Sequence, residues 1–235
     1  AVYAVNAASA GRLAARVLRG QTADLRECEV VDLDEEAYRQ GALSPRLYGA
    51  LSVPFERRLL QARKSPTPLS AQAAMEAIAL DVVEGMQPGV LYIIGPGTTT
   101  RPILARLSLT KTLIGVDVVQ DHRLVAADAN EADLLRLART VPARIIVTPI
   151  GGQGFLFGRG NQQISPAVIR AVGREAIVVV SALEKLLALG GQPLLVDTGD
   201  AEVDRALAGP VRVITGYGER MVYRVQAPLR ELGEG

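Results

Sequence analysis

The spacing of apolar residues along the chain changes near residue 65. Before that point, residues 27–34 and 46–54 predict short strands, and the opening letters AVYAVN read as the middle of another strand. After the prolines of ARKSPTPLSAQ, apolar strands and amphipathic helices follow one another in turn. We therefore predict a β-leaning part over residues 1–64, which continues a domain upstream of Ala1, and an α/β domain over residues 65–235.

Four stretches of the second part repeat the order strand, turn, helix. They are LYIIGPGTTTRPILARL, ARIIVTPI through AVIRAVG, AIVVVSALEKLLAL and QPLLVDTGDAEVDRALAG. Units of this kind form a mostly parallel sheet with flanking helices. The last stretch, VRVITGYGERMVYRV, predicts an antiparallel hairpin, which we expect at an edge of the sheet. Ligands of such sheets bind beyond the carboxyl ends of the strands, so the loops that follow the strands are the candidate sites.

Charge and composition exclude several kinds of function. The chain has 26 Lys and Arg and 25 Asp and Glu residues, so no overall field favours a nucleic acid or an anionic membrane as partner. The single cysteine, Cys28, and the single histidine, His122, rule out a disulfide framework and a Cys/His metal site. We expect a cytoplasmic homo-oligomer with no metal site of its own, in which any phosphate binding comes from a local site.

The first candidate is the glycine–threonine loop, residues 95–101 (GPGTTTR), which follows an apolar strand and opens a helix. Its glycines let an anion approach the backbone, and its three hydroxyl groups and unpaired amides can bind phosphate. The loop is not a Walker A motif, because the Gly-Lys-Ser/Thr ending is absent. The competing interpretation is a tight turn with a threonine N-cap.

The second candidate is the long loop, residues 151–166 (GGQGFLFGRGNQQISP), which ends in a Ser-Pro pair that begins a helix. It has five glycines and no Asp, Glu, His, Cys or Lys. A plain connection would be shorter and more polar, so a ligand-binding loop is favoured. Arg159 and the amides of residues 161–163 offer hydrogen bonds to a polar ligand, whereas Phe155 and Phe157 are expected to pack on the core.

Two further candidates carry carboxylates. Asp117 stands at the end of an expected strand, where it can bind a ribose hydroxyl, orient a metal or act as a base. Asp128 and Asn130, further along, are more simply explained as helix N-caps. The Asp-Thr-Gly loop, residues 197–200, also leads from a strand to a helix, with Asp200 as the expected N-cap.

The hairpin turn, residues 215–220 (TGYGER), is the expected partner of Asp197. Tyr217 can stack on a base or simply pack, and Arg220 can meet a phosphate. His122 lies in a polar turn and Cys28 lies between two glutamates, so a Ser-His-Asp or Cys-His mechanism has little support.

The chain resembles the ATP-NAD kinase-like family in motifs that run in order along it: IIGPGTTTR, IGVDVV, DANE, VTPIGGQGFLFGRGNQQISP, LLVDTGD and ITGYGER. The resemblance covers nearly the whole chain and is closest to the branch that includes the acetoin-catabolism X-type proteins. It implies a phosphotransferase that moves a phosphoryl group from ATP, or from polyphosphate, to the 2′-hydroxyl of NAD and makes NADP. The implied ligands are ATP, NAD and Mg²⁺, and Asp117 is the candidate catalytic carboxylate.

The loops and the resemblance together give one set of expected binding residues for a nucleotide or another phosphorylated small molecule. The set comprises Gly95, Gly97, Thr98, Thr99, Thr100, Arg101, Gly151, Gly152, Gln153, Gly154, Arg159, Asn161, Gln162, Asp197, Tyr217 and Arg220.

The sequence departs from the family in one respect. NAD kinases carry an N-terminal α/β domain with a Gly-Gly-Asp-Gly motif whose aspartate is tied to catalysis, and this sequence has no such motif. In GGQG, Gln153 stands where an aspartate would be needed, so the catalytic role is not carried onto it. The chain therefore resembles the C-terminal portion of such an enzyme. A sugar-phosphate isomerase-like enzyme and a non-catalytic nucleotide sensor are the alternative functions.

Overall fold

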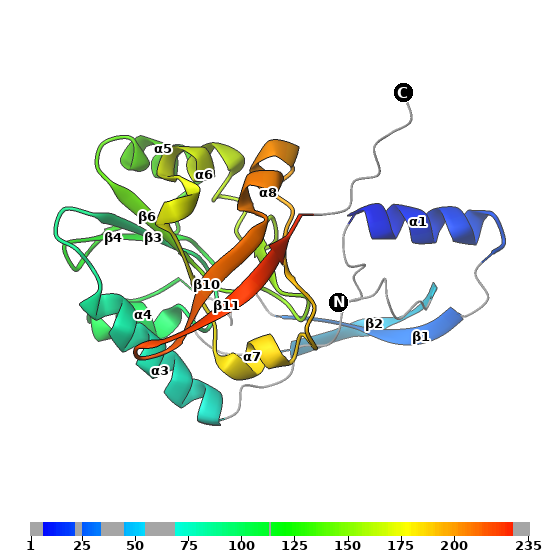
Figure 1. Cartoon of the computed structure of the whole chain (residues 1–235). Coiled ribbons are helices and arrows are strands. Elements are labelled where there is room, and N and C mark those ends of the chain that lie inside the picture. The colour runs from blue at the N-terminus through cyan, green and yellow to red at the C-terminus, as the bar shows by residue number, and fades with distance from the viewer. Residues whose placement is uncertain (1–6, 22–24, 34–44, 55–68, 113, 228–235) are drawn as a thin grey trace. The chain divides into compact units, whose positions relative to one another are not determined.

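The computed structural model describes residues 7–21, 25–33, 45–54, 69–112 and 114–227 (Figure 1). The chain divides into two compact units, Ala1–Lys64 and Ser65–Gly235. The strand expected over residues 1–6 and the prolines of the expected linker lie outside the described residues. Over the described ranges, every helix is too short or too polar to cross a membrane.

The described residues of the first unit form one helix and a two-stranded ribbon. Helix α1 spans Ala7–Leu18 and buries Leu13. Strands β1 (Leu25–Leu33) and β2 (Pro45–Pro54) pair antiparallel along their length. The strands expected over residues 27–34 and 46–54 therefore correspond to this pair.

The second unit is built on one nine-stranded sheet. Its strands are β3 (Leu91–Ile94), β4 (Asp117–Gln120), β5 (Arg123–Ala126), β6 (Ala143–Val147), β7 (Phe155–Phe157), β8 (Ile177–Val180), β9 (Leu194–Val196), β10 (Gly209–Gly216) and β11 (Glu219–Gln226). They are hydrogen-bonded in the order β5-β4-β3-β6-β8-β10-β11-β9-β7. Strands β3, β6, β8 and β10 run parallel, and β7, β9 and β11 form a second parallel group. The predicted mostly parallel sheet is confirmed.

The C-terminal hairpin forms as predicted, but it lies inside the sheet, so the expectation of an edge position is wrong. Strands β10 and β11 pair antiparallel with each other, β8 pairs with the other side of β10, and β9 pairs with the other side of β11. The edges belong to β5 and β7. A hairpin is specified by its local turn, whereas the strands that add to its sides come from distant parts of the chain.

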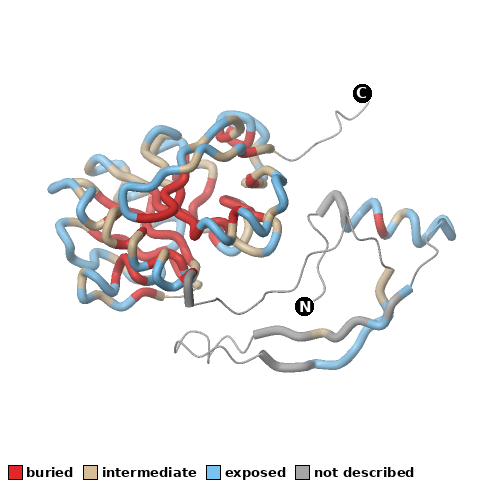
Figure 2. Tube along the Cα trace, turned by 60° about the horizontal axis from the view of Figure 1, so that its bottom comes forward, coloured by how far each residue is buried: buried red, intermediate tan, exposed pale blue. Residues whose placement is uncertain are grey.

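Helices cover both faces of the sheet (Figure 1). Helices α3 (Leu69–Glu84) and α4 (Arg101–Arg106) lie on one side, and α5 (Glu131–Ala138), α6 (Pro166–Val172) and α8 (Ala201–Leu207) lie on the other. The short helix α7 (Leu183–Leu187) follows β8, and a 3-10 turn spans Arg174–Ala176. Figure 2 shows buried residues gathered in the interior of this unit, with exposed positions on its outer surfaces.

Alternate residues of β3 belong to two different hydrophobic cores. Leu91 and Ile93 pack in the core that includes residues of α5, α6 and α8. Tyr92 and Ile94 pack in the core that includes residues of α3 and α4. A parallel strand covered on both faces needs an apolar residue at every position, and the sequence LYII meets that need.

Replacing Ile93 by Ala should lower the free energy of unfolding by about 3–4 kcal/mol, because the side chain is fully buried and its loss leaves a cavity. The control is Leu124→Ala on the edge strand β5, where the residue is 38% exposed and the expected loss is below about 1 kcal/mol. Urea unfolding followed by circular dichroism measures both. If both variants lose the same free energy of unfolding, the burial of β3 between helices on both faces is contradicted.

Candidate functional site

The glycine–threonine loop forms a closed turn directly after β3. The Thr100 hydroxyl lies 2.8 Å from the carbonyl oxygen of Gly95 and 3.0 Å from that of Gly97. Thr100 occupies the N-cap position of α4, but its hydroxyl makes no capping hydrogen bond, so the threonine-cap interpretation is wrong. Thr99 is buried like Thr100, whereas Thr98 and Arg101 are exposed. Thr98 and Arg101 are therefore the side chains of this turn that are open to a ligand.

The long loop contains a strand that the sequence did not predict. Ile150 and Phe155 exchange two backbone hydrogen bonds, of 2.7 and 3.2 Å, and thereby close the turn of residues 151–154. The chain then forms β7, whose three residues are all buried, so the two phenylalanines pack on the core as expected. Within the turn, Gly152 is exposed and Gly154 is buried, and the polar residues 159–163 come after β7.

The glycine–threonine loop lies against Thr148, which precedes the long loop, and near Ile164 of the long loop itself. A Cβ atom at Gly97 would lie 2.7 Å from Cγ2 of Thr148, the residue that follows β6. A Cβ atom at Gly95 would lie 3.7 Å from Cδ1 of Ile164. Gly97 also has a φ of 132°, a conformation that only glycine adopts easily. The structure thus places side by side two loops that the sequence identified separately.

Three oxygen atoms in or beside the long loop are buried with no hydrogen-bond partner in the described part of the chain. They are Oγ1 of Thr148, Oε1 of Gln153 and Oδ1 of Asn161. The amide nitrogen of Asn161 is held, because it donates to the carbonyl of Leu156 at 2.7 Å. A buried acceptor without a donor costs about 1–3 kcal/mol, so a ligand or ordered water that donates to it is favoured. Thr148 is not among the expected binding residues, although a hydroxyl directly after a parallel strand marks it in the sequence.

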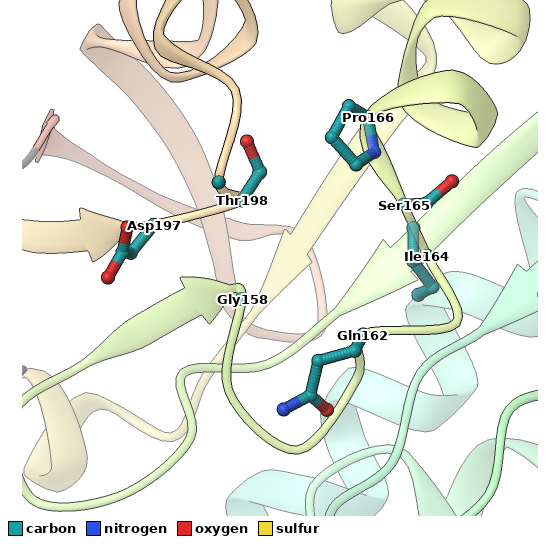
Figure 3. Close-up of a pocket in the computed structure, with 8 residues that line it drawn as sticks. Gly158, Gln162, Ile164, Ser165, Pro166, Asp197 and Thr198 are labelled. Atoms are coloured by element: carbon teal, nitrogen blue, oxygen red, sulfur yellow. The ribbon is translucent and has the colours of Figure 1, made fainter. Parts of the chain in front are cut away.

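The Asp-Thr-Gly loop meets the end of the long loop at a pocket of about 280 Å³ (Figure 3). Gly158 and Thr198 lie on one side of the pocket, and Ser165 lies on the other. Two of the expected binding residues, Gln162 and Asp197, line it. In Figure 3 the Asp197 carboxylate points away from Ser165. The lining of the pocket is more apolar than polar, with Ile164 and Pro166 beside the polar Gln162.

Arg159 and Asp197 interact electrostatically. The Arg159 guanidinium lies over the Phe155 ring, with Cζ 4.7 Å from the ring centre. Burial lowers the pKa of this guanidinium, and the negative charge of Asp197 opposes the shift. Two residues expected to hold a ligand are thus coupled across the long loop and the Asp-Thr-Gly loop.

The carboxylate of Asp117 is surrounded by four donors. Oδ1 accepts from the Thr112 hydroxyl at 2.6 Å and from the Asp128 N–H at 2.9 Å. Oδ2 accepts from the Thr112 N–H at 2.8 Å and pairs with the Lys111 ammonium at 2.9 Å. Asp117 is the first residue of β4, so the expectation that it ends a strand is wrong. Because β4 runs antiparallel to β3, Asp117 nevertheless lies beside Ile94, where the glycine–threonine loop begins. This arrangement does not support its role as a base, because all four lone-pair directions of the carboxylate are occupied.

Lys111 is a buried charge that the sequence did not reveal. Its ammonium donates to the carbonyls of Thr112 and Gly115, both at 2.7 Å, and pairs with Asp117. Burial lowers the pKa of Lys111, and Asp117 acts against that shift. All three N–H bonds of the ammonium are used, so the pair is a closed structural unit. Nothing in the letters SLTKTLIGVD distinguishes a buried lysine from an exposed one.

Tyr217 and Arg220 contact helix α3, and their expected contacts with a ligand stay a prediction. The Tyr217 hydroxyl donates to Oε2 of Glu84 at 2.7 Å, which raises the pKa of Tyr217. The Arg220 guanidinium binds both carboxylate oxygens of Asp81, at 3.1 and 2.7 Å, and the Gly218 N–H adds a bond of 2.9 Å to Asp81. The hairpin turn is therefore fastened to α3.

Three helix caps are confirmed. The side chains of Asn130, Ser165 and Asp200 each accept a backbone N–H from the first turn of α5, α6 and α8, respectively. Asp128 is not the cap of α5, and its N–H donates to Asp117. These side chains serve local structure and need no ligand to explain them.

Gly158 should be far less tolerant of substitution than Gly199, although both have a φ near 90°. A Cβ atom at residue 158 would lie 1.8 Å from the Asp197 carbonyl oxygen, so Gly158→Ala should destabilise the fold by about 3 kcal/mol or more. Nothing lies within 4 Å of a Cβ atom at residue 199, so Gly199→Ala should cost only about 1 kcal/mol. Thermal unfolding measures both losses. Similar values would argue against the close approach of the two loops.

Asp117→Asn should lower the free energy of unfolding by about 3–5 kcal/mol, because it leaves the Lys111 ammonium buried without its counter-charge. Asp133→Asn, which removes an exposed pairing with Arg136, should cost less than about 1 kcal/mol. Guanidinium unfolding compares the two. Near-wild-type stability of Asp117→Asn together with lost activity would restore Asp117 as the candidate base.

Comparison with known proteins gives one family. The family model of the ATP-NAD kinase C-terminal domain matches residues 88–225, which include the glycine–threonine loop, the long loop, the Asp-Thr-Gly loop and the hairpin turn. No curated protein and no solved structure matches the chain. The match covers more than half of the 235 residues. The chain therefore belongs to the ATP-NAD kinase C-terminal domain family.

Proposed function

We propose that this chain is the nucleotide-binding part of an NAD kinase-like phosphotransferase that makes NADP from NAD and either ATP or polyphosphate. The observation that carries the proposal is the match to the ATP-NAD kinase C-terminal domain over residues 88–225. Catalysis is proposed for the full-length protein. We also propose that the full-length protein belongs to the acetoin-catabolism X-type branch and carries an upstream Gly-Gly-Asp-Gly domain.

The glycine–threonine loop is the proposed phosphate site. Gly97 lets the loop pack closely against Thr148, and the exposed Thr98 can donate a hydrogen bond from its hydroxyl to a phosphate oxygen. Thr100 holds the turn closed from within, so its shape exists before a ligand arrives. A site prepared in this way loses little conformational entropy when phosphate binds.

The turn of residues 151–154 is the proposed dinucleotide site. Oε1 of Gln153 and Oγ1 of Thr148 are buried and unpaired within the described residues, so each can accept a hydrogen bond from a ribose hydroxyl or an amide of NAD. The contact of Thr148 with Gly97 sets this turn next to the proposed phosphate site. Donor phosphate and acceptor hydroxyl would therefore be held close together, which is the main task of a phosphoryl-transfer enzyme.

In the proposed reaction, the 2′-hydroxyl oxygen of NAD attacks the terminal phosphorus of the donor. The new oxygen–phosphorus bond forms as the bond to the leaving phosphate breaks, and a base takes the hydroxyl proton. Asp117 is enclosed, so we place that base in residues upstream of this chain. No three His, Cys, Asp or Glu side chains of the described residues gather to hold a metal, so we place Mg²⁺ on the donor phosphates.

Two experiments test the proposal. The full-length protein, incubated with NAD, ATP or polyphosphate and Mg²⁺, should form NADP, measured by a coupled dehydrogenase assay. The purified chain should bind NAD in calorimetry. Binding of ribose 5-phosphate alone would favour the isomerase-like alternative, and nucleotide binding by a full-length protein that forms no NADP would favour the sensor.

Thr98→Val should weaken ATP binding by roughly ten- to a hundredfold, because a hydrogen bond to a charged phosphate is worth about 1.5–3 kcal/mol. Thr110→Val is the matched control, because Thr110 is also exposed but lies outside the loop. This variant should bind ATP as tightly as wild type. Calorimetric titration with ATP measures both. If the two variants bind ATP equally well, the phosphate does not bind at this loop.

A further inference from the structure

Helix α7 and the residues that follow it border the long loop. The helix has five residues, Leu183–Leu187, and it is anchored by Leu186, which is 1% exposed and belongs to the same core as β3 and β6. Lys185 precedes this anchor and is half-buried, so its side chain starts from a fixed backbone. The helix comes directly after β8, the neighbour of β6 in the sheet.

Contacts from this segment reach both ends of the turn of residues 151–154. At its beginning, the Lys185 ammonium donates to the carbonyl oxygen of Pro149. At its end, a Cβ atom at Gly154 would lie 3.0 Å from Cδ1 of Leu189, two residues beyond α7. The Gly154 carbonyl also accepts from the N–H of Leu195 at 2.9 Å. The turn is thus held from outside at both ends.

The Ile150–Phe155 pair closes the turn, but the backbone hydrogen bond within the turn is weak, so support from neighbouring residues adds to its order. Inside the Ile150–Phe155 pair, the Gly154 N–H donates to the Gly151 carbonyl at 3.4 Å, which is long for a backbone hydrogen bond. Pro149 has no N–H, so only its carbonyl can fix the peptide that leads from β6 into the turn. Three glycines nearby leave the backbone with many accessible conformations.

We propose that Lys185 is a positioning residue for the dinucleotide site. By holding the Pro149 carbonyl, it fixes the backbone between Thr148 and Gln153, whose buried oxygens are the proposed acceptors for the ligand. Lys185 acts through this carbonyl and need not touch the ligand. The inference rests on the proposed function, because it takes the ligand of this turn to be NAD.

Hydrogen exchange tests the positioning step without a ligand. In the full chain, Lys185→Met keeps the length of the side chain and removes its charge, and it should speed amide exchange in residues 150–155 at least tenfold. Lys185→Arg should restore most of the protection, because a guanidinium can also donate to a carbonyl. Glu184→Gln is the matched control on the same helix and should leave exchange unchanged. Wild-type exchange rates in Lys185→Met would overturn the proposal.

Calorimetric binding of NAD to the same variants tests the link to the ligand. Lys185→Met should bind NAD about tenfold more weakly than wild type, Lys185→Arg should recover most of this affinity, and the melting temperatures should stay within a few degrees. If wild type binds NAD and Lys185→Met binds equally well, the positioning role is wrong while the proposed function stands. If wild type itself does not bind NAD, the proposed function fails, and the exchange experiment alone decides whether Lys185 orders the turn.

Discussion

The antiparallel pairing of β10 with β11 is the interaction on which the arrangement of the second unit depends. It joins two groups of parallel strands, β3-β6-β8-β10 and β11-β9-β7, which run in opposite directions. The long loop begins after β6, which belongs to the first group, and it contains β7, which belongs to the second. The shape of the loop therefore depends on how the two groups are joined. The contacts of Arg220 and Tyr217 hold the same hairpin against helix α3, on one face of the sheet. The pairing of β10 with β11 thereby brings the loops of both groups of strands into one region.

Polar groups in this region fall into two kinds with different consequences. The Lys111–Asp117 pair is buried and every donor and acceptor in it is matched, so it stabilises the loop before β4 and offers nothing to a ligand. The oxygens of Thr148, Gln153 and Asn161 are also buried, yet they lack partners within the described residues. Unmatched buried acceptors are costly, and they are retained most readily where a ligand completes them.

An NAD kinase-like function suits a site with few acids and bases. Phosphoryl transfer depends on holding donor and acceptor in line and on neutralising charge, and glycine turns, hydroxyls and amides can do the holding. The glycine–threonine loop is kept closed by Thr100, whereas the turn of residues 151–154 depends on neighbours such as Lys185 and Leu189. The first is therefore held by its own residues, whereas the second is also held by residues of α7 and of the segment after it.

The sequence by itself determined the type and order of most elements and the caps at Asn130, Ser165 and Asp200, and it identified the loops that are proposed to bind the ligand. These features depend on residues within a few positions of one another, through periodicity and local hydrogen bonds. Only the tertiary structure decided that Asp117 is enclosed by Lys111, that Arg220 binds Asp81, and that the hairpin lies inside the sheet. Each of these depends on segments that fold together from distant positions, and burial, which decides whether a charge is available for chemistry, is fixed only when those segments pack.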